Sequence, residues 1–461
     1  MASTSDSRTT GLSSRGVHRP RFSAETLFVV LAVVLMNVIT IKAVTQFGTV
    51  MLFAPALVLG LSFAALRILD DPVEVLCWFL FIIVNLDFLR IKETQLTADI
   101  LTSSMLLYVL MVRFGLSGSF GIKGPVERTF LVYLALTFIS TLLSVDVPSS
   151  IKNWGRELEY WVLFVFLSTL AVSERDRFRI ARAVALSSIV PCVLGLVGLV
   201  LGIDAFYGQT TPVAGGAEVH RITGTLSHPV VFSLYLSVVA ALTLSMLLTQ
   251  KRSRAILLPA FLLQITVLFL TYGRTGWITF LVAVIVMLWT LGRRKILFAG
   301  LPLLLAGIVS TIPSLLARMQ NAVQLGDNSL IWRVGLWIYA LEKFPQRPIF
   351  GSGQDTFRHY VSYGKGFDSH HTWIGLLIET GLVGVIAFLV VMIAVGRALA
   401  RRRKDPEAKR DYLVVGVHAI FIGILVSSFA GEPFDLPAVA VYFWVLLALA
   451  LRSPASLRPT G

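Results

Sequence analysis

The sequence predicts an all-α fold, a polytopic integral membrane helical bundle of about 12–14 transmembrane helices. Of its 461 residues, 56% are hydrophobic and only 14% are charged, and the mean hydropathy is +0.79. These values lie well outside the range of soluble proteins. Uncharged stretches such as Leu27–Ile39, Val230–Leu248 and Ile296–Val309 are long enough, with their flanks, to cross roughly 30 Å of hydrocarbon as helices. They are also too long and continuous for barrel strands.

Residues 24–452 are predicted to form the transmembrane domain. A disordered basic tail precedes it at 1–23, and a short tail follows at 453–461. No small-residue cleavage site follows the first apolar run, so we expect a retained anchor. Charged residues near the ends of the second to fourth runs leave a count of twelve spans open. The predicted spans begin near residues 26, 49, 73, 97, 127, 155, 180, 229, 255, 275, 296, 372, 412 and 438.

The distribution of Lys and Arg predicts the orientation. With the N-terminus inside, the inner segments hold about two thirds of the 40 Lys and Arg residues, the excess that the positive-inside rule requires. The strongest inner anchor is the Arg-Arg-Arg-Lys run at 401–404, and further basic segments lie at 175–182, 251–254 and 293–295. Both tails are therefore predicted to be cytoplasmic. The same rule accounts for the net charge of +14, so nucleic acid is not an expected partner.

The two cysteines, Cys77 and Cys192, lie in apolar runs far apart in the chain. They indicate neither a disulfide framework nor a metal site.

Two segments predicted on the outer side are long, 203–228 and 314–371. The second is too long for a simple connection and is a candidate functional loop. Within it, Leu330–Phe344 has helical spacing, and Pro345 is expected to end the helix. This amphipathic helix is expected either to pack on the core or to contact a substrate. Its apolar face contains Trp332, Leu336, Tyr339, Ala340 and Phe344.

The outer segment 314–371 also contains Gly351-Ser352-Gly353. This spacing has the appearance of a nucleotide-binding loop, but no strand precedes it and it lies on the outer side. A tight structural turn is the better interpretation.

Charged and titratable side chains from separate segments are predicted to meet on the outer side. Arg274 lies between two long apolar runs, and the long outer loop contains Arg333, His370 and His371. Guanidinium groups bind phosphate well, and an imidazole accepts a proton near neutral pH. The two histidines are adjacent, so on a helix they point about 100° apart. Because no third ligand at a typical spacing accompanies them, we expect no bound metal.

Four short motifs occur in order along the second half of the chain. Arg221 is followed by Thr223-Gly224-Thr225 and His228-Pro229, and Arg274 by Thr275-Gly276. Arg333 is followed by Trp337 and Pro348–Gly353, and His370 by Gly381 and Gly384. Together these motifs, over roughly residues 150–450, resemble the O-antigen ligase and polymerase family of bacterial polytopic glycosyltransferases. The chain departs from the family pattern at Gly273, where serine is common, and at His371, where Asn, Ser or Gln is usual.

The resemblance implies an enzyme of the bacterial inner membrane with its active site outside the cytoplasm. The donor would be an undecaprenyl-diphosphate-linked glycan, and the acceptor a hydroxyl of lipid A–core or of a growing glycan. Neither a cofactor nor a metal ion is implied. Arg274 and Arg333 would stabilise the diphosphate leaving group, with Arg221 and His371 as further substrate-binding residues. His370 would be the catalytic base, although His371 stays open as an alternative.

Three functions are compatible with the sequence. A ligase-like transferase fits the histidine–glycine pattern best, and a polymerase of O-antigen or exopolysaccharide repeat units needs the same leaving group and base. A polysaccharide or lipid transporter, or a flippase, belongs to another class and predicts ionisable residues within the spans. The later spans contain almost none, with Glu379 as the exception.

Overall fold

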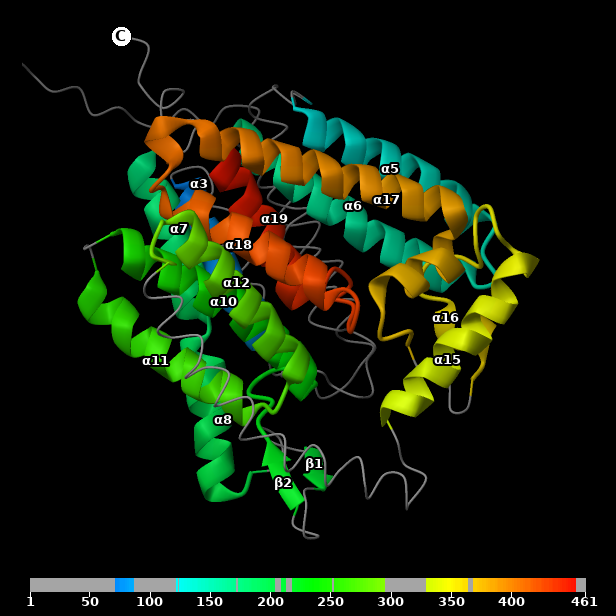
Figure 1. Ribbon diagram of the computed structural model, residues 1–461, viewed down its shortest axis with the longest axis horizontal. Coiled ribbons are helices and arrows are strands. Elements are labelled where there is room, and N and C mark those ends of the chain that lie inside the picture. Colours follow the sequence, from blue (N-terminus) through cyan, green and yellow to red (C-terminus); the bar gives the residue numbers. More distant parts are fainter. Residues whose placement is uncertain are drawn as a thin grey trace, which may run out of the picture. The chain divides into compact units, whose positions relative to one another are not determined.

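A computed structural model gives the structure of residues 71–86, 122, 124–170, 173–203, 209–212, 218–250, 253–294, 329–363 and 368–452. These residues belong to one compact unit, Leu66–Gly461. They form helices and one short hairpin (Figure 1), which confirms the predicted all-α class. The helices are α3 (Pro72–Leu86), α5 (Pro125–Leu142), α6 (Val147–Thr169), α7 (Glu174–Ser187), α8 (Ile189–Leu201), α10 (Pro229–Thr249), α11 (Arg254–Leu270), α12 (Arg274–Thr290), α15 (Ser329–Lys343), η3 (Phe344–Gln346), α16 (Phe357–Val361), α17 (Thr372–Lys404), η4 (Pro406–Ala408), α18 (Tyr412–Ser427) and α19 (Pro437–Leu451).

The predicted spans that begin near 73, 127, 155, 180, 229, 255, 275, 372, 412 and 438 coincide with helices. In the described part of the chain, α5, the α7–α8 pair, α10 and α17 are long and apolar enough to cross a membrane, and five shorter helices are also apolar. The starts predicted near 26, 49, 97 and 296 lie outside the described residues, as do both predicted tails. The total number of spans therefore stays a prediction.

Helices α10 and α19 form the centre of the bundle. Both are apolar on all sides, the pattern of a helix that is buried all round. α10 packs against α11, α12, α18 and α19, and its Phe232, Leu236 and Leu242 are fully buried. Its hydroxyl groups have partners: the Ser245 hydroxyl donates to the Tyr412 carbonyl at 2.6 Å, and the Tyr235 and Ser187 hydroxyls lie 2.7 Å apart.

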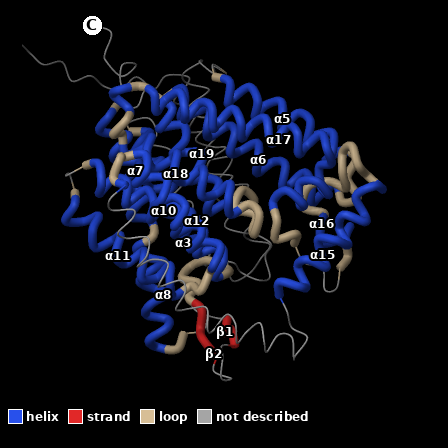
Figure 2. Tube along the Cα trace, in the orientation of Figure 1, coloured by secondary structure: helices blue, strands red, loops and turns tan. Residues whose placement is uncertain are grey.

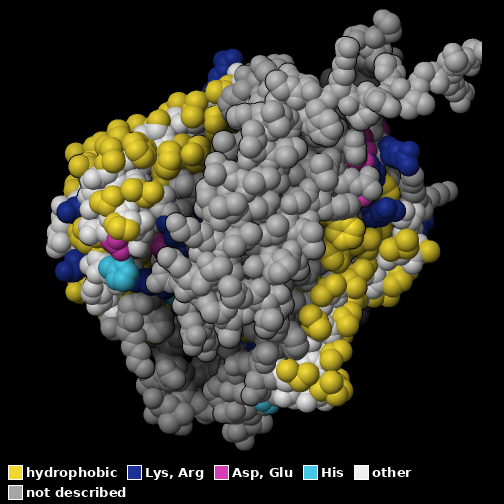
Figure 3. Space-filling model, turned by 180° about the vertical axis from the view of Figure 1, so that it is seen from behind, with side chains coloured by type: hydrophobic (Ala, Val, Ile, Leu, Met, Phe, Trp, Pro, Cys, Tyr) yellow, Lys and Arg dark blue, Asp and Glu magenta, His cyan; other side chains and the backbone are white. Residues whose placement is uncertain are grey.

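Helices α5 and α17 run side by side along one edge (Figures 1 and 2), and both carry exposed hydrophobic side chains. Figure 3 shows a band of hydrophobic side chains over this region. Exposed apolar side chains are costly in water but suited to lipid. The band includes Leu131, Val132, Leu142, Leu382, Ile386, Leu389, Val390 and Ile393.

The basic segments predicted as inner loops are partly helical. Residues 175–182 lie within α7, and 401–404 form the last turn of α17. α7 begins early because the Ser173 hydroxyl caps it and because Arg177, fully buried, pairs with Asp411 at 2.8 Å. Cations in the last turn of α17 are favoured by the helix dipole.

Segments predicted on the same side of the membrane contact one another. On the outer side, the Val145 amide donates to the Ser352 carbonyl at 2.8 Å, and the Thr372 amide to the Ser428 carbonyl at 3.0 Å. On the inner side, Arg179 pairs with Asp71 at 3.0 Å. These contacts agree with the relative sidedness that the basic residues predict.

A hairpin in the segment 203–228 was not predicted. Strand β1 (Gln209–Pro212) pairs antiparallel with β2 (Glu218–Arg221), and Gln209 lies opposite Arg221. The β-branched residues in both strands favour the extended conformation. The hairpin places Arg221 at the end of a strand, beside the start of α12.

Candidate active site at one end of the helices

Arg274 is the first residue of α12, and its side chain is exposed. The turn before it is fixed by the Gly273 amide, which donates to the Thr271 hydroxyl at 3.1 Å. In the next turn, Gly276 packs directly on the backbone of Ser233, where a side chain would overlap. The close packing of α12 on α10 therefore fixes where the guanidinium group of Arg274 emerges.

Arg333 lies on α15, the amphipathic helix that the sequence predicts. Leu336 and Ala340 are buried against Phe357, Val361 and Ile378, and the helix ends before Pro345 as expected. The apolar face therefore packs on the core. The half-buried guanidinium of Arg333 has a lowered pKa because of burial and the nearby charge of Arg274, whereas Glu432 acts in the opposite direction.

Helix α17 is interrupted at Gly381, whose φ of 66° and ψ of −169° are not helical. The loop at 348–353 docks on this break: the Leu382 amide donates to the Pro348 carbonyl at 2.9 Å, and the Gly353 amide to the Glu379 carbonyl at 2.8 Å. Gly351 and Gly353 both have positive φ, which confirms the predicted tight turn. The glycines of two motifs thus meet and fix the first two turns of α17.

His370 occupies a tight turn immediately before α17, with a positive φ of 51°. Three contacts hold the neighbouring Ser369. Its carbonyl accepts from the Trp337 indole at 2.8 Å, its hydroxyl donates to the Glu432 carboxylate, and the same oxygen accepts from the His371 amide at 3.1 Å. The backbone at His370 is therefore fixed by α15 and by the loop between α18 and α19.

The His370 imidazole is partly buried and lies beside the Trp332 ring, with ring centroids 6.4 Å apart. Burial and the charge of Arg333 lower its pKa; Asp368 opposes this shift, and Arg358 adds to it. The Asp368 carboxylate is itself paired with Arg358, at 2.8 Å from Nη2. A lowered pKa leaves the imidazole neutral at pH 7, the state in which it accepts a proton.

His371 has a different position. It is the N-cap of α17, where its Nδ1 accepts from the Ile374 amide at 3.3 Å. Its ring lies edge-on to Trp337 and Phe429, with centroids 5.1 and 5.8 Å away. One ring nitrogen thus caps the start of the helix, and the ring packs between aromatic side chains.

Arg221 is tied to the turn before Arg274. Its Nε donates to the Thr271 carbonyl at 2.9 Å. His228, seven residues later, is the N-cap of α10 and accepts from the Val230 amide at 3.1 Å. Burial lowers the pKa of His228 to about 4, and the charges of Arg221, His370 and Arg333 add to this effect. His228 therefore belongs to the same electrostatic cluster as the predicted site residues.

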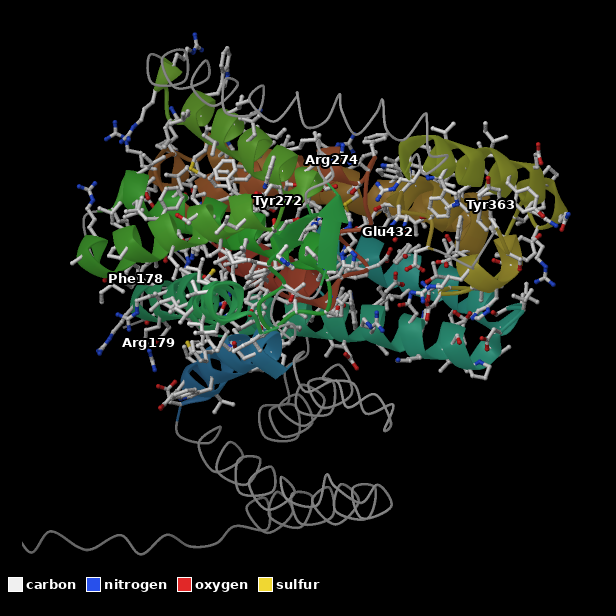
Figure 4. All side chains as sticks on the ribbon, turned by 90° about the horizontal axis from the view of Figure 1, so that it is seen from below. Phe178, Arg179, Tyr272, Arg274, Tyr363 and Glu432 are labelled. Carbon is white, nitrogen blue, oxygen red and sulfur yellow. The ribbon has the colours of Figure 1, made fainter. Side chains whose placement is uncertain are left out.

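Arg274, Arg333, Arg221, His370 and His371 thus come from four separate segments of the chain and gather at one end of the described helices. Figure 4 shows Arg274 and Glu432 in this region, where the Thr275 hydroxyl reaches the Ala430 carbonyl at 3.5 Å.

The sequence did not single out two members of the cluster. His228 was noted only as part of a motif, although a histidine directly before a helix-starting proline is a signal for a cap. Glu432 carries no local signal, because its hydrogen bond with Ser369 and its electrostatic effect on Arg333 join segments more than 60 residues apart.

Other acidic side chains near this end connect helices. Glu157 accepts from the Tyr133 hydroxyl at 2.8 Å and from the Gln354 amide at 2.6 Å, and Glu379 accepts from the Phe357 amide at 3.0 Å. The Glu379 carboxylate therefore binds a backbone amide of the long loop predicted on the outer side. Among the described residues, no three His, Cys, Asp or Glu side chains are grouped so as to hold a metal ion.

Comparison with known proteins identifies the part of the chain that carries this geometry. Residues 259–389 match the family model described as O-Antigen ligase. The chain carries an O-antigen ligase family domain. The matched residues include Arg274, Arg333, His370 and the Gly381 break, but not Arg221 or Glu432.

A second comparison finds a distant relative. The chain is 25% identical over 135 residues to "Exopolysaccharide production protein ExoQ" of Rhizobium meliloti (strain 1021). The match covers 25% of this chain and 30% of the relative, so it spans less than a third of the relative's length.

Proposed function

We propose that the protein is a membrane glycosyltransferase that moves a glycan from undecaprenyl diphosphate to an acceptor hydroxyl. The proposed site is the outer face of a bacterial inner membrane. The observation that carries this proposal is the meeting of Arg274 and Arg333 with a neutral His370 within an O-antigen ligase family domain.

The proposed reaction is a direct displacement. The acceptor oxygen forms a bond to the anomeric carbon, and the bond from that carbon to the phosphate oxygen breaks. The electron pair of the broken bond stays on the diphosphate, and the acceptor proton passes to the His370 imidazole. Permanently charged guanidinium groups stabilise the negative charge that grows on the leaving group. Arg274 and Arg333 are assigned this role, and Arg221 is assigned to binding the glycan diphosphate.

The geometry favours His370 over His371 as the base. His371 uses Nδ1 to cap α17 and packs between Trp337 and Phe429. The pattern of the resembled family has Asn, Ser or Gln at this position, and Asn and Ser are common helix caps. His371 therefore supports the site by fixing the turn that carries His370.

Two acceptors fit the proposal. In a ligase the acceptor is lipid A–core, and in a polymerase it is a growing glycan. The similarity to a protein named for exopolysaccharide production favours a polymerase of repeat units as the second candidate. The residues at the site are common to both reactions.

Purified protein in detergent, given lipid-linked glycan and acceptor, tests the proposal. We expect transfer without an energised membrane, and at least about a hundredfold loss of rate in Arg274→Ala, Arg333→Ala and His370→Ala. Lys343→Ala is the matched control, because Lys343 lies on α15 like Arg333 but stacks on Tyr339. Movement of the lipid-linked glycan across a bilayer without a change of bonds would instead indicate a transporter or flippase.

A further inference from the structure

A second cationic site lies at the opposite end of α17 from His370. About 45 Å of helix separates Thr372 from Arg402, and the basic residues predict that this end faces the cytoplasm. A cavity of about 520 Å3 opens here between α5, α6, α17 and α19. Arg401, Arg402 and Arg452 line it, and Val126, Phe164 and Leu451 form an apolar wall.

The guanidinium of Arg402 is the main reason to regard this cavity as a binding site. The residue is only 8% exposed, and its Nε and Nη2 have no hydrogen-bond partner among the residues that the structure describes. Its Nη1 pairs with Asp405. A buried guanidinium with unsatisfied donors is costly. The buried Nε of Arg452 likewise has no partner in the described part of the chain, and burial together with the charge of Arg177 lowers the pKa of Arg452 to about 10. Both side chains therefore have buried N–H groups for which the described residues supply no acceptor.

Apolar grooves extend from this cavity along the surface between α5 and α17. The first shares Pro125 and Arg401 with the cavity. The second shares Thr129 and Val390 with the first and is lined further out by Val132, Leu136, Val383 and Ile386. Val132 and Ile386 are more than half exposed. The cationic end thus opens into a continuous hydrophobic surface.

Charge along this path is unbalanced. Only Glu127 and Asp405 are acidic among the lining residues, and Asp405 is already paired with Arg402. The cationic lining residues are Arg128, Arg397, Arg401, Arg402, Lys404 and Arg452.

We propose that this end of the α5–α17 surface binds an anionic glycerophospholipid of the inner leaflet. The phosphate accepts from the free donors of Arg402 and Arg452, and an acyl chain lies in the groove between α5 and α17. A lipid fits better than a free phosphate ion because the cavity has an apolar wall and opens into an apolar groove. A charge-assisted hydrogen bond to phosphate supplies the donor with its missing partner. The site is separate from the proposed transferase site and does not depend on it.

Lipid-dependent thermal stability of the detergent-purified protein tests the proposal. Phosphatidylglycerol is expected to raise the unfolding midpoint, whereas phosphatidylcholine, diacylglycerol and inorganic phosphate are expected to have little effect. Arg402→Gln combined with Arg452→Gln should remove the response. The control is Arg403→Gln, because Arg403 lies next to Arg402 but contacts His418 at 3.3 Å; it should keep the full response. A full response to inorganic phosphate alone, or equal responses to both phospholipids, would overturn the proposal.

Two further measurements remain informative if the double variant does not fold. Arg401→Gln changes an exposed side chain of the same cavity and should reduce the response to phosphatidylglycerol. Native mass spectrometry of the unchanged protein, exchanged into equal parts of phosphatidylglycerol and phosphatidylcholine, should show about a tenfold excess of retained phosphatidylglycerol, because the cationic lining residues repel the choline group of phosphatidylcholine. Retention of the two lipids in equal amounts would contradict the site.

Discussion

Replacing Gly381 by alanine should both destabilise the protein and impair the proposed site. The backbone at this position lies in a region that is open almost only to glycine, and a side chain there costs about 1–3 kcal/mol. An added Cβ would also overlap the carbonyl of Ile349 and lie 2.7 Å from the Phe350 amide nitrogen. These are backbone atoms of a docked loop, so they cannot move aside as a flexible side chain does.

The same substitution threatens the hydrogen bonds across the break in α17. The Leu382 amide donates to the Pro348 carbonyl at 2.9 Å, and the Val383 amide to the Ile349 carbonyl at 3.2 Å. Each contributes about 1 kcal/mol. Together with the backbone strain, Gly381→Ala should cost on the order of 3–5 kcal/mol. The loop would detach, and the first turns of α17 that follow His370 would lose their support.

Thermal unfolding in detergent and glycan transfer measure the two effects. We expect the unfolding midpoint of Gly381→Ala to fall by at least about 5 °C and transfer to be lost. Gly155→Ala is the control, since Gly155 lies in α6 and no atom of the described residues comes within 4 Å of an added Cβ; its midpoint should be unchanged or slightly higher. A Gly381→Ala protein as stable and active as the original would refute the reasoning from the α17 break.

Three further predictions concern the site itself. His371→Asn should keep the α17 cap and most of the activity, whereas His371→Ala should lose about 1 kcal/mol of stability; equal stability of the two variants would argue against the cap. Arg333→Lys keeps the charge but loses the planar fork, so we expect normal protein levels and at least about a tenfold slower transfer; unchanged rates would exclude a paired contact to the diphosphate. Burial and the charge of Asp435 raise the pKa of Glu432 to about 8 from 4.5. The folded state therefore favours the protonated Glu432 side chain, whose contribution to folding stability is complete below pH 4.5 and is lost as the pH rises to about 8. Glu432→Gln should therefore flatten the fall of the unfolding midpoint between pH 5 and pH 8, and an unchanged slope would contradict this account.

Features with a local cause could be predicted from the sequence. The start of α10 follows from the proline after His228, and the start of α18 follows from the end of a basic segment. Helix α15 follows from the spacing of Leu336 and Ala340. The turn at Gly351–Gly353 follows from its glycines. In each case nearby residues decide the structure, so the pattern is visible in a short window.

Features that depend on distant contacts could not be predicted. The break at Gly381 lies in a run that reads as continuous helix, and it exists because the loop at 348–353 supplies the missing hydrogen bonds. Likewise, the position of His370 depends on Glu432 and Trp337, which reach Ser369 from other elements. The family resemblance brought His370 and Arg333 to attention, but the roles assigned to them remain proposals.

The central claim is that the cluster of Arg274, Arg333 and His370 lies on the outer side of the membrane. Cysteine labelling in membrane vesicles tests this claim most directly. Tyr272→Cys and Ser362→Cys place exposed thiols beside the cluster, and Lys409→Cys places one at the opposite end. The background should have Cys77 and Cys192 replaced by serine. An impermeant maleimide should label positions 272 and 362 in right-side-out vesicles, and position 409 only in inverted vesicles. Labelling of 272 and 362 only in inverted vesicles would place the cluster in the cytoplasm and contradict the proposed transfer to an outer acceptor.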